Sequence, residues 1–196
     1  AEITKSFIPL CDAYDKKDYK TAHKIFLKVA KKGDADAQRY LGWMHENGQG
    51  VPQDDKEAAK WYRLAADQGD ASAQNNLGWK YDQGQGVPQD YKESVKWYRL
   101  AAEQGQANAQ VSLGLIYDQG KGVPQNYKEA LKWFRLAAKQ GSANAQSNMG
   151  MMYSDGLGVE QDYKEAVRWY RLSAEQGDAT GQSNLGTMYE NGWGVP

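Results

Sequence analysis

Apolar residues recur along the chain with the period of an α-helix. Ala58, Trp61, Tyr62, Ala65 and Ala66 occupy positions i, i+3, i+4, i+7 and i+8, so all five lie on one face of a helix with 3.6 residues per turn. Charged residues fill most of the positions between them. The segment therefore predicts an amphipathic helix that ends at the next glycine.

A second apolar pattern precedes this helix. Ala37, Leu41 and His45 follow one another at intervals of four residues, which again places them on one helical face. Between the two segments, the stretch Gly-x-Gly-Val-Pro-Gln contains Pro52, and proline cannot continue a helix. The two segments therefore predict a pair of helices joined by a tight connection.

The same pair of helices returns every 36 residues. Glycines mark this step at Gly33, Gly69, Gly105, Gly141 and Gly177, at Gly42, Gly78, Gly114, Gly150 and Gly186, and at the pairs Gly48/Gly50, Gly84/Gly86, Gly120/Gly122, Gly156/Gly158 and Gly192/Gly194. A fixed period of this length is typical of solenoids and other repeat architectures. We call a set of equivalent positions in successive repeats a column. Glycine inside a helix costs about 1 kcal/mol relative to alanine, so the glycine column that begins at Gly42 predicts that the paired helix approaches closely there.

The expected helix starts carry residues that can cap them. The first helices open on Asp34, Asp70, Gln106, Ser142 and Asp178. Gln106 is the one poor cap among them. The second helices open on Asp54, Asp90, Asn126 and Asp162, each followed three residues later by glutamate. This spacing predicts a capping box, in which the glutamate side chain binds back to the backbone N–H of the capping residue.

These columns divide the chain into six parts. Residues 1–33 form a degenerate N-terminal helix pair that caps the array, 34–69, 70–105, 106–141 and 142–177 form four repeats, and 178–196 form a truncated half repeat. Pro9 should limit or kink the first helix of the cap. The half repeat holds a first helix without its partner, so Leu185, Met188 and Tyr189 are expected to expose an apolar face.

The repeated motif resembles that of a known family. It reads Ala-x-Ala-Gln-x-x-Leu-Gly-x-x-Tyr-x-x-Gly-x-Gly-Val-Pro, followed by x-Asp-x-Lys-Glu-Ala-x-x-Trp-Tyr-x-x-Ala-Ala-x-x-Gly, and is similar to the Sel1-like repeat, a relative of the tetratricopeptide repeat. The resemblance covers residues 34–196. It implies an all-α fold, a right-handed α-solenoid of antiparallel helix pairs with a concave inner face. Departures from the motif are His45 and Asp55, each in place of tyrosine, and Glu160 in place of proline.

Composition narrows the classes of function. The net charge of −1 argues against a dominantly electrostatic partner such as nucleic acid. No apolar run approaches the roughly 18 residues that a membrane-spanning helix needs, so membrane insertion is not expected. The single cysteine, Cys11, rules out an intramolecular disulfide. The chain begins Ala1-Glu2, as after signal-peptide removal, which favours a periplasmic or secreted protein, with a cytoplasmic location as the alternative.

Candidate residues for chemistry are few. The two histidines, His23 and His45, align with Val95 and with a core tyrosine column, which favours a structural role for both. The Gly-x-Gly loops follow helices rather than strands and lack Gly-Lys-Ser/Thr, which indicates turns rather than a phosphate site. The Trp-Tyr pairs are interpreted as inter-helix core rather than as a platform for stacking bases. We therefore predict no enzyme activity, no metal and no cofactor.

The outer side of the second helices is the remaining charged surface. Lys56, Lys60 and Arg63, with their equivalents in the other repeats, form a basic stripe that Glu57 and Asp67 balance. We interpret this stripe as a solvated convex face.

Function is expected on the first helices, where positions differ from one repeat to the next. By analogy with tetratricopeptide arrays, positions two before, two after and five after the motif leucine face the concave groove. These positions hold Arg39, Trp43, Glu46, Asn75, Trp79, Asp82, Val111, Leu115, Asp118, Ser147 and Met151. An apolar ladder with acidic neighbours predicts a scaffold that binds a protein or peptide segment bearing basic residues. Alternatively, the ladder from Trp43 to Met151 only packs neighbouring first helices.

Two other classes of function stay open at this point. A hydrolase acting on cell-wall or small-molecule substrates would need a pocket with convergent titratable groups. An end-to-end assembly component would self-associate through the C-terminal half repeat. A partner identified in the native host would separate these classes from a scaffold.

Overall fold

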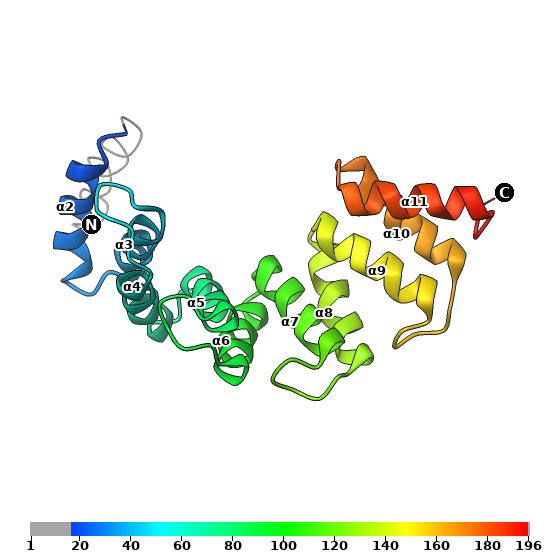
Figure 1. The fold of residues 1–196 in the computed structure, drawn as a ribbon, viewed down its shortest axis with the longest axis horizontal. Helices are drawn as coiled ribbons and strands as arrows, with labels where there is room; N and C mark the ends of the chain where they lie inside the picture. The colour runs from blue at the N-terminus through cyan, green and yellow to red at the C-terminus, as the bar shows by residue number, and fades with distance from the viewer. Residues whose placement is uncertain (1–16, 196) are drawn as a thin grey trace. The chain divides into compact units, whose positions relative to one another are not determined.

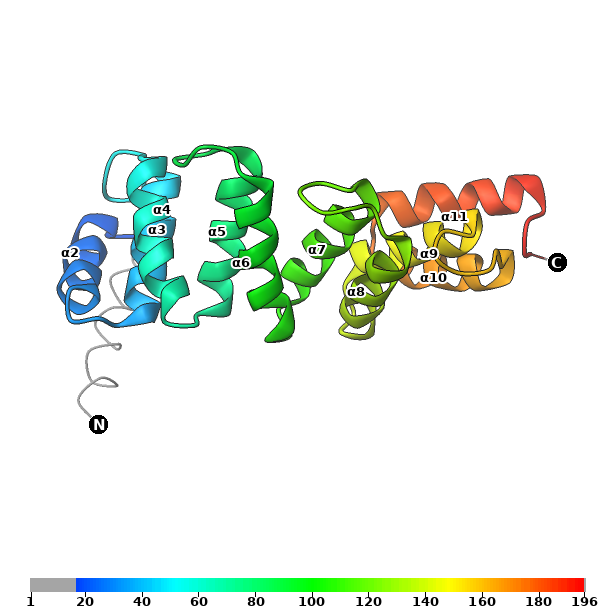
Figure 2. The same ribbon diagram turned by 90° about the horizontal axis from the view of Figure 1, so that it is seen from below.

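All regular secondary structure in the described chain is helical. The computed structural model describes residues 17–195, which contain ten α-helices and no strand (Figures 1 and 2). The helices are α2 (Tyr19–Ala30), α3 (Ala35–Asn47), α4 (Asp55–Asp67), α5 (Ala71–Gln83), α6 (Tyr91–Glu103), α7 (Ala107–Gln119), α8 (Tyr127–Lys139), α9 (Ala143–Asp155), α10 (Tyr163–Glu175) and α11 (Ala179–Asn191). Odd-numbered labels mark the first helices of the repeats and even-numbered labels the second helices. The predicted helix pairs and the all-α class are confirmed.

The chain divides into two compact units on either side of the Trp97–Tyr98 bond, inside α6. In the first unit α2 packs against α3, α3 against α4, and α4 against α5; in the second, α7 packs against α8, α8 against α9, and α10 against both α9 and α11. Within each unit, these helices therefore pack against their neighbours along the chain. The right-handed course of the whole array stays a prediction.

Small residues and aromatic rings alternate in the cores. One cluster of the first unit contains Ala22, Phe26, Ala30, Ala37, Leu41 and Met44, and the other contains Ala58, Tyr62, Ala65, Ala66, Ala73, Leu77 and Trp97. In the second unit, Phe134 and Tyr170 take the place of Tyr62 at the centre of equivalent clusters. In each Trp-Tyr pair, the second aromatic residue therefore lies in the core, as the helical spacing predicts.

At Gly42 and Gly86, neighbouring groups leave no room for a side chain. A Cβ atom on Gly42 would lie 2.6 Å from Cδ1 of the Tyr62 ring, so the close approach predicted for this column is real. Gly86 in the connection has a φ of +74° and lies directly on the carbonyl of Asp55, the first residue of the preceding second helix. The repeat glycines therefore fix how each hairpin closes on its neighbours.

Capping differs from the prediction in two respects. Gln106, expected to be a poor cap, accepts a hydrogen bond from the Ala109 N–H at 2.6 Å through its side-chain carbonyl, so that expectation was wrong. Asp54 caps α4 by accepting from the N–H groups of Lys56 and Glu57 at 2.9 and 3.1 Å. The return bond of a capping box is absent, because the Asp54 N–H donates to the carbonyl of His45 at 2.9 Å.

The same bond closes the connections from α5 to α6, from α7 to α8 and from α9 to α10. Asp90, Asn126 and Asp162 donate their N–H groups to the carbonyls of Tyr81, Tyr117 and Tyr153 at 3.0, 2.8 and 2.9 Å. The glutamates three residues after each cap are consequently free to pair elsewhere. They pair with the basic residue one turn later, as Glu129 does with Lys132 and Glu165 with Arg168.

The C-terminal half repeat is better covered than expected. Met188 is only 2% exposed and belongs to the cluster around Ala166, Val167 and Tyr170 of α10. A first helix is buried by the second helix before it as well as by the one after it, so the prediction of an exposed Met188 was wrong. Tyr189 does remain 51% exposed.

At the other end, the predictions for Pro9 and Cys11 fall outside the described residues. Within them, the His23 and His45 rings meet edge to face with centroids 5.5 Å apart. His23 Nε2 and His45 Nδ1 are both buried and form no hydrogen bond with the described residues. The two histidines therefore pack against each other between α2 and α3.

This contact predicts a pH dependence of folding. Burial lowers the pKa of His23, and the neighbouring His45 lowers it further. The unfolded chain therefore binds more protons than the folded chain as the pH falls through about 6.5, and stability should decrease on acidification. His23→Val, which installs the residue of the Val95 position, should reduce the drop in melting temperature between neutral and mildly acidic pH by about 1–3 °C. Equal drops for the variant and the parent protein, followed by circular dichroism, would contradict this.

Candidate functional site

The two tryptophans predicted to line the groove of the first unit differ in exposure. Trp43 on α3 is half-buried and packs against both core clusters of the unit. Trp79 on α5 is 38% exposed, and the Lys80 Nζ lies 4.9 Å from the centroid of its ring. Trp43 therefore mainly packs between helices, as the alternative interpretation of the ladder proposed, whereas Trp79 exposes part of its ring to solvent.

Arg39 joins consecutive first helices. Its Nε donates to Asp70 at 3.2 Å and its Nη2 donates to Asp36 at 2.8 Å, while the guanidinium lies 4.7 Å from the centroid of the Tyr40 ring. Burial acts to lower the pKa of Arg39, but the bonds to Asp36 and Asp70 outweigh it and raise that pKa. Asp70 also caps α5 through the Ala73 N–H, so Arg39 ties the first helix of one repeat to the start of the first helix of the next.

Glu46 uses its carboxylate inside the protein. One oxygen accepts a hydrogen bond from the Tyr62 hydroxyl at 2.6 Å, and the other lies 2.7 Å from the Lys80 Nζ. Lys80 is fully buried and also pairs with Asp55 at 2.7 Å. Burial and the bond to Glu46 together raise the pKa of Tyr62 far above its ordinary value. Glu46 was predicted to contact a partner, but its carboxylate already binds Tyr62 and Lys80 within the protein.

Sequence reasoning missed Lys80. Its column otherwise contains only apolar residues, namely Met44, Ile116, Met152 and Met188. A lone charge in an apolar column was the available signal, because a buried ammonium requires acidic partners. Asp55, which departs from the tyrosine of the motif, is one of the two partners.

The polar residues of α5 complete the first unit's candidate surface. Asn75 donates weakly to Asn76 at 3.4 Å, and its own Oδ1 is buried without a hydrogen bond from the described residues. Asp82 is half-buried near the end of the helix and accepts a hydrogen bond from Gln83. Both side chains belong to the same helix as the exposed ring of Trp79.

The candidate residues of the second unit are mostly apolar and partly buried. Val111 and Leu115 of α7 are half-buried and pack against the same core cluster of α8 and α9. On α9, Ser147 is buried and Met151 is half-buried. Asp118 is half-buried, and burial raises the pKa of its carboxyl group. This part of the surface therefore combines apolar side chains with one acid that is poorly solvated.

The basic stripe of the second helices is not uniformly solvated. Arg63 donates to the Tyr81 hydroxyl and lies 5.4 Å from the centroid of the Trp97 ring. The same bond joins Arg99 to Tyr117, Arg135 to Tyr153 and Arg171 to Tyr189. The interpretation of Arg63 as part of a solvated face was therefore wrong. The residue after each arginine is instead an exposed leucine: Leu64, Leu100, Leu136 and Leu172.

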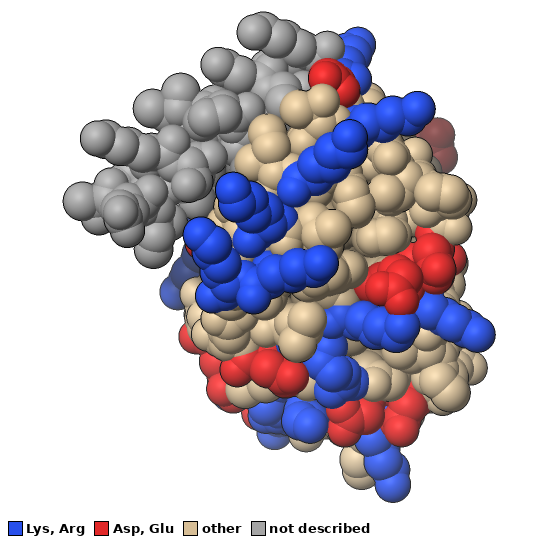
Figure 3. Space-filling model, turned by 90° about the vertical axis from the view of Figure 1, so that its left-hand side faces the viewer, with Lys and Arg blue, Asp and Glu red and all other residues tan. Residues whose placement is uncertain are grey.

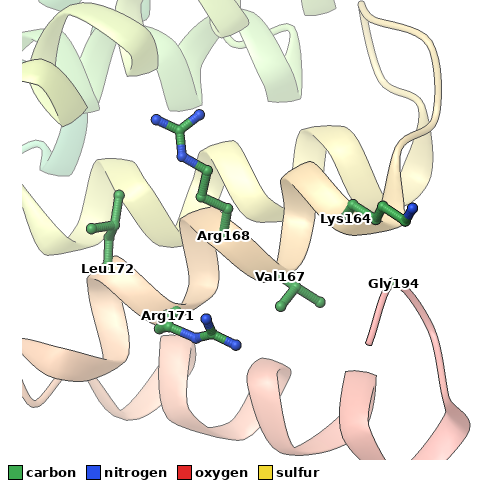
Figure 4. Close-up of a pocket in the computed structure, with 6 residues that line it drawn as sticks. All are labelled: Lys164, Val167, Arg168, Arg171, Leu172 and Gly194. Atoms are coloured by element: carbon green, nitrogen blue, oxygen red, sulfur yellow. The ribbon is translucent and has the colours of Figure 1, made fainter. Parts of the chain in front are cut away.

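A shallow pocket of about 340 Å³ lies on α10 in the second unit (Figure 4). Its lining consists of Lys164, Val167, Arg168, Arg171, Leu172 and Gly194. The close-up shows Arg168 and Leu172 on one side of α10 and Val167 and Arg171 on the side of α11. Three cations line it, without a carboxylate or a nucleophile, so its chemistry offers no acid–base pair.

Comparison with known proteins identifies the repeats. The Sel1 repeat description matches residues 35–70, 71–106, 107–142, 143–178 and 179–196. The chain belongs to the Sel1 repeat family. No curated protein sequence matched it. Among the described residues, no helix is both long and apolar enough to cross a membrane.

Solved Sel1-repeat structures share the fold. A Sel1 repeat protein from Oxalobacter formigenes is 38% identical over 96% of this chain and 78% of its own, with a TM-score of 0.89. The protective antigen c5321 of uropathogenic Escherichia coli, described as displaying an SLR fold, is 45% identical with a TM-score of 0.88, and the match covers 91% of this chain and 38% of that one. The resemblance seen in the motif is thus confirmed, and proteins of this kind are generally protein–protein interaction scaffolds.

Proposed function

We propose that this Sel1-repeat protein binds a segment of a partner protein on the exposed sides of its first helices. The observation that carries the proposal is the exposed ring of Trp79. Leu77 and Gly78, its neighbours in the motif, are buried, yet Trp79 keeps 38% of its surface exposed. A large exposed aromatic side chain on a rigid helix is typical of residues that anchor a binding partner.

The second unit favours a partner segment that is both apolar and basic. Val111, Leu115 and Met151 leave part of their apolar surface accessible. Burial disfavours the ionised form of Asp118, so a cation brought by a partner would stabilise that carboxylate. An apolar segment that carries a lysine or arginine satisfies both features.

Trp79→Ala should remove capture of the partner while leaving the fold intact. The matched control is Leu64→Ala, which removes an exposed apolar side chain from α4 in the same unit. Loss of an aromatic anchor typically weakens binding by about 2 kcal/mol or more, a thirtyfold or larger change. Trp43→Ala is unsuitable for this purpose, because Trp43 also packs against two core clusters.

The measurement is quantitative mass spectrometry of proteins retained from a lysate of the native host by the parent protein and the two variants. We expect at least one protein to be lost with Trp79→Ala and kept with Leu64→Ala. Equal retention by all three proteins would refute binding on this face.

A further inference from the structure

Helix α2 exposes a row of lysines along its outer side. Lys20, Lys24 and Lys28 follow at steps of four residues within α2 and are exposed, so they share one face of the helix. Lys17, two residues before the helix, and Lys31, its C-cap residue, are exposed as well. The opposite face carries the buried residues Ala22, Phe26 and Ala30. Figure 3 looks onto this end of the protein and shows basic side chains gathered over much of it. We refer to these five lysines as the lysine face.

In the other second helices, the cation at the position of Lys24 forms an ion pair with a glutamate of the same helix. Lys96, Lys132 and Arg168 stand at the position of Lys24 and pair with the glutamate three residues earlier at 3.5, 3.6 and 3.0 Å, and Lys60 pairs with Glu57 in the same way. In α2 the position of that glutamate is Thr21. Among the described residues, Lys24 forms no ion pair.

Two more positions add charge to α2. Lys28 occupies the column of the exposed leucines that begins with Leu64, and Lys31 occupies the column that holds Asp67, Glu103 and Glu175 in three of the four repeats. Asp18 is the one acid in residues 17–32, and its carboxylate caps the helix by accepting from the Thr21 N–H at 3.2 Å.

Neither solubility nor helix stability accounts for this arrangement. A polar outer surface is also obtained from the mixed charges of α4, α6 and α10, without repulsion between like charges. Lysines in the last turn stabilise a helix through its dipole, which explains Lys28 and Lys31 but not Lys20 and Lys24. Within residues 17–195, the lysine face therefore has no ion pair like those that Glu57, Glu93, Glu129 and Glu165 form in the other second helices.

We propose that the lysine face of α2 binds an acidic segment of a partner protein. The other repeats show which group suits this position, because in each of them a carboxylate on a helix pairs with the equivalent cation. Successive lysines rise about 6 Å along the axis, so a partner helix with acidic residues at four-residue steps matches them. The face contains no arginine, and α2 offers no exposed aromatic ring for stacking bases, which disfavours nucleic acid. This surface is separate from Trp79, so it does not depend on the proposed function above.

The experiment measures binding of a short fluorescent poly-L-glutamate to the full chain at low ionic strength by fluorescence anisotropy. The variant Lys20→Glu/Lys24→Glu/Lys28→Glu should lose about tenfold or more in affinity, and added salt should weaken the binding of the parent protein. The matched control is Lys128→Glu/Lys132→Glu/Lys139→Glu, which makes the same change in net charge on exposed positions of α8. The control should change affinity by no more than about threefold.

Thr21→Glu provides a second variant that removes no lysine. It restores the glutamate of the repeats, which should pair with Lys24 and weaken poly-L-glutamate binding by about twofold to fivefold. Equal losses in the α2 and α8 triple variants would overturn the proposal, because net charge alone would then explain the binding. Tighter binding of an oligothymidylate of equal charge, or of vesicles containing phosphatidylglycerol, would overturn it as well.

Discussion

Lys80→Met is expected to destabilise the first unit by about 2–4 kcal/mol, although methionine is the usual residue of that column. The substitution removes the one cation that lies against Glu46 and Asp55. It leaves two carboxylates near each other, and breaking a buried ion pair usually costs about 3–5 kcal/mol. The side chains of Glu46 and Asp55 keep 25% and 35% of their surface exposed, so water offsets part of this cost.

The matched control replaces the whole cluster. Glu46→Ser/Asp55→Tyr/Lys80→Met installs the residues that stand at the same three positions near the end of the chain, Ser154, Tyr163 and Met188. Ser154 lies within hydrogen-bonding reach of Tyr170, which stands at the position of Tyr62, so a serine in place of Glu46 can interact with the tyrosine hydroxyl. The triple variant should recover stability to within about 1 kcal/mol of the parent protein. Urea unfolding followed by circular dichroism checks both variants; a single variant as stable as the parent would mean that the ion pairs contribute nothing.

The repeat itself was predictable because its causes are local. Helix periods, the caps at Asp34 and Asp54, and the turn around Pro52 depend on residues close in sequence, and the return of each feature every 36 residues confirmed it. The close approach at Gly42 was also predictable, because a glycine in mid-helix needs a packing reason. Each of these features is therefore visible in the printed sequence.

Contacts between neighbouring repeats were not predictable in the same way. Lys80 and Asp55 each break the motif, but only the fold shows that they meet. Arg63 was placed in solvent because its helical position is on the outer side, whereas its long side chain reaches Tyr81 on the next first helix. Met188 was misplaced because the burial supplied by the preceding second helix was not considered.

The candidate surface also combines features that the sequence predicts with contacts that only the fold shows. Trp43 and Trp79 stand at equivalent positions of two repeats, and the residue type alone does not separate a packed ring from an exposed one. The difference arises because Trp43 contacts the clusters on both sides of it, while Trp79 is accompanied by the buried Lys80. Sequence variation suggested the candidate surface, and the packing of neighbours determines which of its residues remain accessible.

Gly150→Ala is expected to destabilise the second unit by about 1–3 kcal/mol. A Cβ atom at this position would lie 2.5 Å from two carbons of the Tyr170 ring, which is too close for any side chain. Tyr170 is buried in the cluster of α10 and α11, and its burial raises the pKa of the phenol to about 12. The ring therefore cannot move away without disturbing the core, and thermal unfolding should show a lower midpoint.

Gly186→Ala tests the reason for this loss, because Gly186 stands in the same column with nothing within 4 Å of the added atom. Alanine favours a helix over glycine by about 1 kcal/mol, so this variant should be more stable than the parent protein. Opposite signs for two identical substitutions would show that the glycine column is maintained by the ring of the paired helix. Destabilisation by both would mean that the helices require glycine for another reason, and the packing explanation of the 36-residue repeat would fail at its central residue.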